Sequence, residues 1–126
     1  MKRFFLKIFK KRDLEVSGIN FNKGVIQCFF PHLVEHVYEG DLMECIKKLS
    51  QQKKQYDFIN LTNVIEHVVD PSGALGCIKE ILSNDGILRI SVPNDFSKLQ
   101  LDAVSRGCAR DQYWVSIPVH LNYFSI

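Results

Sequence analysis

The sequence lacks three features that would place it in a class directly. No apolar run approaches the roughly 20 residues that span a bilayer. The first residues also lack the apolar stretch and small-residue cleavage site of a secretory signal. The four cysteines lie 17, 32 and 31 residues apart with no Cys-x-x-Cys pair, which suits neither a zinc knuckle nor a disulfide framework. We therefore expect a cytoplasmic protein with reduced cysteines.

What is present is the composition of one ordinary globular domain. The 126 residues are 46% hydrophobic and 24% charged, enough for a single core. The charge is uneven, because residues 1–12 carry six basic side chains and no acid while the net charge is only +2. The apolar residues of this segment share one helical face, which is typical of a surface helix docked on a sheet. Contact with an anionic membrane is the alternative, and we expect no nucleic-acid partner.

Short apolar runs alternate along the chain with segments of helical periodicity. We predict strands over 14–19, 33–38, 57–62 and 87–92, and helices over 22–30, 42–54, 70–82 and 96–104. Two helix starts have specific signals, since Asn22 is a favoured capping residue and Asp70-Pro71 combines a capping acid with a proline at the first helical position. Alternation of this kind predicts right-handed crossovers and a mostly parallel sheet.

Polar residues follow each predicted strand. In an open parallel sheet, ligands bind at the carboxyl ends of the strands. The polar residues at these ends are Asn20, Asn22, Asp41, Thr62, Asn63, Asn94 and Asp95. Turns are also rich in such residues, so the pattern alone leaves both a binding site and plain turns open.

Several segments together resemble class I S-adenosylmethionine-dependent methyltransferases. The most specific is the run over residues 56–71, which contains Glu66-His67-Val68 and Asp70-Pro71. Its spacing to Ser91-Val92-Pro93-Asn94 and to His120-Leu121-Asn122-Tyr123-Phe124-Ser125 also fits that family. The resemblance covers about residues 3–126 and is nearest to the branch of ubiquinone-type O-methyltransferases.

The resemblance implies a partial Rossmann-like α/β fold, a mostly parallel sheet with helices on both faces, without the family's first strand and last two strands. It also implies one partial domain over 1–126, with a βα core at 1–93 and an acceptor-side segment at 94–126. The sequence holds no Gly-x-Gly-x-Gly loop, whose missing side chains let the backbone approach the cofactor. A fragment, a mis-started reading frame and a decayed relative would each explain this.

The resemblance assigns cofactor-binding roles to five residues. The family's ribose-binding acid corresponds to Asn20, which offers one neutral acceptor where a carboxylate offers two charged ones. Asp41 corresponds to the acceptor for the adenine amino group, and Leu42 to a residue that packs on the ring. Thr62 and Asn63 correspond to the methionine and sulfonium end. Because of Asn20 and the missing loop, we expect S-adenosylmethionine to bind this chain weakly or not at all.

The acceptor side has one candidate catalytic residue and one possible metal site. His120 corresponds to a general base, since imidazole titrates near neutrality. In some relatives a Glu-x-x-Glu-His segment and a distant histidine bind a divalent metal. Here Asn63 replaces the first acid and leaves Glu66, His67 and His120, so with a single acid we expect no response to magnesium or manganese.

The implied function is methyl transfer to a small-molecule, sugar or lipid nucleophile, carried out mainly by positioning. The alternative is a catalytically inactive domain that acts as an oligomerisation or regulatory partner. In the family the first strand is central to the sheet, so its absence would leave two unpaired strand edges. We therefore expect a homo-oligomer joined through sheet edges or swapped elements.

Overall fold

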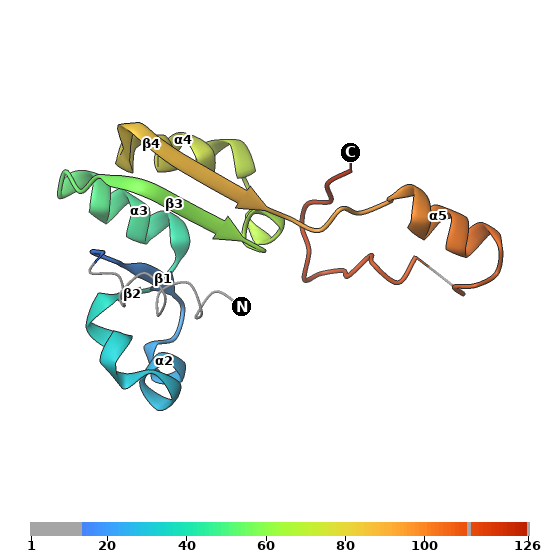
Figure 1. Cartoon of the computed structure of the whole chain (residues 1–126), viewed down its shortest axis with the longest axis horizontal. Coiled ribbons are helices and arrows are strands. Elements are labelled where there is room, and N and C mark those ends of the chain that lie inside the picture. The colour runs from blue at the N-terminus through green and yellow to red at the C-terminus, as the bar shows by residue number, and fades with distance from the viewer. Residues whose placement is uncertain (1–13, 111, 126) are drawn as a thin grey trace. The chain divides into compact units, whose positions relative to one another are not determined.

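The computed structural model describes residues 14–110 and 112–125 (Figure 1). The basic segment 1–12 with its predicted surface helix therefore lies outside the described residues. The rest divides into two compact units: one takes in the described residues up to Gln55 with Cys77–Ile81, and the other Tyr56–Gly76 and the chain from Leu82 onward. The division into 1–93 and 94–126 stays a prediction. No helix in the described part of the chain is both apolar and long enough to span a membrane.

The first unit contains one pair of short parallel strands with helices. Its elements are β1 (Gly18–Asn20), α2 (Lys23–Phe29), the 3-10 helix η1 (Pro31–His36), β2 (Val37–Glu39) and α3 (Leu42–Gln51). The register of β1 on β2 runs from Gly18 beside Val37 to Asn20 beside Glu39. The side chain of Asn22 accepts the N–H of Gly24 and begins α2, as the sequence predicts.

Two strand predictions in this unit are wrong in their bounds. Only Gly18–Asn20 forms a strand where 14–19 was expected, and most of 33–38 is the 3-10 helix η1. Pro31 starts this helix with a φ suited to a first helical position. Leu33 from η1 and Val37, the first residue of β2, are then buried together with Ile26. The run of apolar residues is therefore explained by a helical turn that enters a short strand.

The second unit contains a longer parallel pair. Its elements are β3 (Tyr56–Thr62), the 3-10 helix η2 (Ile65–His67), the first part of α4 (Pro71–Ile81), β4 (Leu82–Ser91) and α5 (Lys98–Ser105). β3 and β4 lie side by side and point the same way (Figure 1). The register is regular from Phe58 beside Ile87 to Thr62 beside Ser91. The predicted start of α4 is confirmed, because Asp70 Oδ1 accepts the N–H of Gly73.

β4 begins at Leu82 rather than at the predicted Ile87, so Asn84-Asp85-Gly86, three residues typical of a turn, lie inside the strand. Tyr56 pairs with Leu82 and Phe58 with Ile87, so β4 carries extra residues opposite β3. Such an irregularity absorbs turn-forming residues without ending the strand. The hydroxyl of Ser83 donates to Asp57 and holds this part of β4 to β3.

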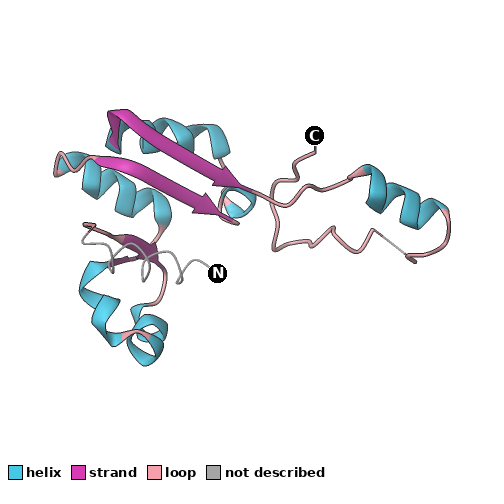
Figure 2. Ribbon diagram, viewed as in Figure 1, coloured by secondary structure: helices cyan, strands magenta, loops and turns pink. Residues whose placement is uncertain are grey.

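The described residues after α5 form loops and turns (Figure 2). Hydrogen bonds hold this segment at several points. The N–H of Asp95 donates to Phe124 O at 2.7 Å, and Leu121 and Asn122 both donate their N–H groups to Glu66 O. The side-chain amide of Asn122 also donates to Val68 O at 2.6 Å. These bonds hold residues 120–124 beside η2. The architecture is the predicted mixed α/β fold with parallel strands, consistent with a partial Rossmann-like fold.

Candidate functional site

Asn20 and Asp41 lie at the same edge of the first unit. β1 and β2 are parallel, so their carboxyl ends meet, and the N–H of Gly40 donates to Asn20 O at 3.1 Å. The side-chain oxygen of Asn20 accepts the N–H of Asn22 at 3.0 Å. The one neutral acceptor at the predicted ribose position is therefore already engaged in a local turn.

Asp41 is the N-cap of α3. Its Oδ1 accepts the N–H groups of Met43 at 2.8 Å and Glu44 at 3.2 Å. Gly40 places it there with φ of +139°, a conformation open essentially to glycine alone. Both bonds use Oδ1, so among the described residues Oδ2 keeps its capacity to accept from a ligand. Leu42 begins α3 directly after this carboxylate.

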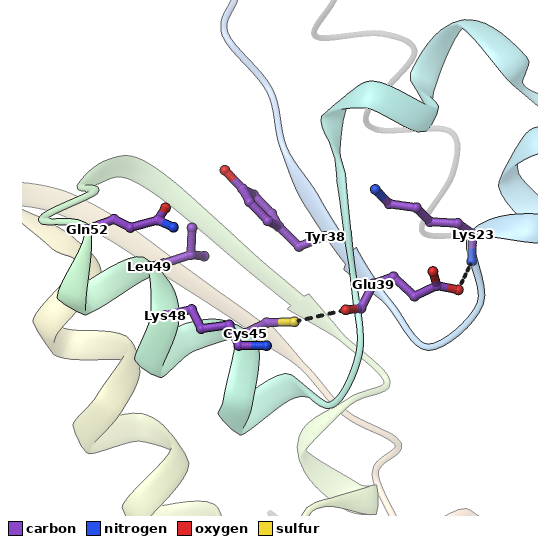
Figure 3. A pocket seen from close by; sticks show the side chains of 7 residues that line it. All are labelled: Lys23, Tyr38, Glu39, Cys45, Lys48, Leu49 and Gln52. Atoms are coloured by element: carbon purple, nitrogen blue, oxygen red, sulfur yellow. Dashed lines mark hydrogen bonds between the residues drawn. The ribbon is translucent and has the colours of Figure 1, made fainter.

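A cavity of about 310 Å³ lies beside this edge, lined by Lys23, Tyr38, Glu39, Cys45, Lys48, Leu49 and Gln52 (Figure 3). None of the predicted cofactor residues lines it. Glu39 Oε1 accepts the N–H of Lys23, and the thiol of Cys45 contacts Glu39 O. Burial raises the pKa of the Cys45 thiol, and the nearby charge of Lys48 offsets part of that rise. Sequence reasoning missed this cavity, because its lining residues come from elements that no motif connects.

Thr62 and Asn63 end β3 in different environments. The hydroxyl of Thr62 is buried and exchanges hydrogen bonds with the Asn60 side chain, while Arg89 donates to both residues. Thr62 therefore belongs to a network on the sheet. Asn63 is exposed and has φ of +50°, an uncommon conformation that often marks a functional turn. Of these two residues, only Asn63 is exposed to solvent and therefore accessible to a ligand.

Glu66, His67 and His120 come together in the second unit. Each offers one ligand atom, and these atoms all lie within 4.8 Å of one another. The two imidazole rings meet edge to face with centroids 5.0 Å apart. Glu66 comes from η2, and His120 is held there by the bonds of Leu121 and Asn122 to Glu66 O. Glu66 and His120 lie 54 positions apart in the sequence, and the folded C-terminal segment brings them together.

A family model described as a methyltransferase domain matches residues 5–126. The match covers both units and nearly the whole chain. The chain belongs to a methyltransferase domain family. No curated protein and no solved structure gave a significant match. The prediction of a methyltransferase family is thereby confirmed. The match does not support the finer assignment to the ubiquinone-type branch.

Within this methyltransferase-family domain the predicted residues form two groups. Asn20, Asp41 and Leu42 share one edge of the first unit. In the second unit, Asn63 follows β3, and His120 joins Glu66 and His67. The first group lies at the carboxyl ends of β1 and β2, and Asn63 follows β3 directly, which is where parallel sheets bind ligands.

Proposed function

We propose that this chain is part of an S-adenosylmethionine-dependent methyltransferase that acts on a small-molecule, sugar or lipid nucleophile. The observation that carries the proposal is the methyltransferase family match over residues 5–126. It is supported by the polar residues gathered at the carboxyl ends of β1 and β2. The acceptor atom of that nucleophile is an oxygen, a nitrogen or a carbon.

The residues of the first unit fit the adenosine end of the cofactor in part. Asp41 Oδ2 can accept from an exocyclic amino group while Oδ1 keeps its bonds to α3. Asn20 fits less well, because its neutral oxygen already accepts the N–H of Asn22. Replacing a charge-assisted bond by a neutral one costs about 1.5–3 kcal/mol, or roughly 10- to 100-fold in affinity. We therefore expect weak binding.

The residues of the second unit would position and deprotonate the acceptor. When bound, the cofactor supplies an electrophilic methyl group, and the chain must orient a nucleophile in line with it. His120 is half-buried, and its Nδ1 has no hydrogen-bond partner among the described residues. This nitrogen can accept the proton that the nucleophile loses. Asn63, the other predicted residue of this unit, lies exposed directly after β3.

A catalytically inactive domain is the second candidate function. The observation that favours it is the engagement of the Asn20 oxygen within its own turn. Such a domain would serve as an oligomerisation or regulatory partner and would not need the cofactor. It predicts no specific contact between S-adenosylmethionine and the edge that holds Asn20 and Asp41.

An NMR titration of the isotope-labelled chain with S-adenosylmethionine separates the two candidates, because it detects weak binding and locates it. The methyltransferase proposal predicts progressive shifts of the Asn20, Asp41 and Leu42 amides, with a dissociation constant above about 10 µM, or about 7 kcal/mol of binding. Shifts confined to other residues, or none at millimolar cofactor, would favour the inactive domain. Adenosine alone is the control, and it should reproduce the shifts at Asp41 and Leu42.

A further inference from the structure

The carboxylate of Glu66 is fully buried, at 0% exposed, yet neither of its oxygens has a hydrogen-bond partner among the described residues. Its main chain is well fixed, since Glu66 O accepts the N–H groups of Leu121 and Asn122 at 2.8 and 3.0 Å. A buried carboxylate without a donor or cation is strongly unfavourable. The position therefore calls for a positive group against the two free oxygens.

His67 presents a lone pair toward this carboxylate. Its Nδ1 lies 2.7 Å from Val119 O, and a carbonyl oxygen can only accept, so Nδ1 carries the hydrogen. In the neutral imidazole Nε2 then has the lone pair, and Nε2 lies 3.8 Å from Glu66 Oε1. A histidine whose second nitrogen donates to a backbone carbonyl is the arrangement found at metal ligands.

His120 supplies a second imidazole to the same place. Its Nδ1 is buried and has no partner in the described part of the chain. Together the three side chains bring one carboxylate and two nitrogen donors within 4.8 Å of one another. On a tetrahedral zinc ion with bonds of about 2.0 Å, ligand atoms lie roughly 3.3 Å apart. Small side-chain rotations would bring the donors to that spacing.

We propose that Glu66, His67 and His120 bind a zinc ion. Two imidazoles and one carboxylate form a donor set typical of zinc sites that keep a fourth position open. Magnesium prefers oxygen ligands in octahedral geometry, so the expectation of no response to magnesium stands. We expected no metal because the group contains a single acid. A zinc site needs only one carboxylate when two histidines supply the other ligands, so the single acid does not exclude zinc.

The fourth coordination position of the zinc ion would bind an oxygen atom. A catalytic role for this position rests on the proposed methyl transfer. A zinc ion lowers the pKa of a bound hydroxyl or water, so it would replace His120 as the means of activating an acceptor oxygen. Zinc binding itself needs no cofactor or acceptor. The test below therefore fails or succeeds independently of the methyltransferase proposal.

The test measures zinc affinity of the metal-free full chain by competition with a chromophoric zinc chelator. The exposed cysteines are first replaced, as Cys28→Ser and Cys108→Ser, so that thiolates do not bind the metal. We expect one zinc ion per chain. Glu66→Gln, His67→Ala and His120→Ala should each weaken binding at least tenfold, as the loss of one ligand from a three-ligand site requires.

His36→Ala is the matched control, because Glu35 and His36 are also adjacent and their side chains lie 3.2 Å apart in the first unit. This variant should bind zinc like the parent. Cobalt bound to the parent should give the intense visible absorption of a tetrahedral site, a readout that needs no variant. Absence of zinc binding in the parent, or equal affinity in the parent and in folded His120→Ala and Glu66→Gln, would overturn the proposal.

Discussion

Asp41 combines two roles at one residue, and substitution can separate them. Asp41→Ala removes both the cap of α3 and the carboxylate, whereas Asp41→Ser keeps an oxygen for the N–H groups of Met43 and Glu44. We expect Asp41→Ala to lower the free energy of unfolding by about 1 kcal/mol and Asp41→Ser to change it by a few tenths. Urea denaturation followed by circular dichroism measures both.

Binding of S-adenosylmethionine should respond differently to these two variants. Both should weaken it by a similar factor, because both lose the carboxylate. Glu39→Gln is the control, since it keeps an acceptor for the N–H of Lys23 and lies outside the predicted adenine position. If Asp41→Ser binds as tightly as the parent, the assignment of Asp41 to the adenine amino group is wrong.

At the scale of single residues, the sequence predicted local hydrogen bonds better than tertiary surroundings. Asn22 and Asp70 cap helices as predicted, because capping depends on neighbours two or three positions away. Asp41 was predicted only as an adenine-binding residue, and it also caps α3. The hydrogen bond from Arg89 to Thr62 depends on the β3–β4 register, which places Arg89 beside Asn60. The lack of hydrogen-bond partners for the Glu66 oxygens among the described residues could not be predicted either, because it also depends on tertiary surroundings.

At the scale of elements, helices with explicit start signals were predicted closely and short strands were not. The predicted helices 22–30 and 70–82 are observed as Lys23–Phe29 and Pro71–Ile81. The predicted helix 42–54, which has no such signal, ends earlier, at Gln51. The segment 33–38 was misassigned, because an apolar run with residues four apart also suits a helical turn. β4 was predicted to start late, because Asn84-Asp85-Gly86 resembles a turn but is accommodated within the strand.

At the scale of the whole molecule, unpaired strand edges lead to a prediction about assembly. Among the described residues, β1 pairs only with β2 and β3 only with β4, so each of the two sheets consists of two edge strands. Such edges can pair with a strand of another chain. We expect a homo-oligomer, most simply a twofold dimer, joined through sheet edges or swapped elements. Light scattering across a dilution series tests this, and a folded monomer persisting at micromolar concentration would refute it.

The family and the α/β class could be predicted from the sequence, because both depend on motif spacing and on alternation along the chain. The methyl acceptor could not be predicted from the sequence, because recognition of the acceptor depends on side chains that the fold brings together from separate segments. The Glu66–His67–His120 group is the clearest example. Its members were noted as a possible metal site, but only the structure showed that their ligand atoms meet.

The central claim is that this methyltransferase-family domain has a cofactor site weakened at Asn20. The most direct test compares the affinity of the parent and of Asn20→Asp for S-adenosylmethionine, by NMR titration under identical conditions. A carboxylate at this position restores a charged acceptor with a second oxygen beyond the one bonded to Asn22. We expect a dissociation constant about 10- to 100-fold lower for Asn20→Asp. Equal affinities, or a parent that already binds below about 10 µM, would contradict it.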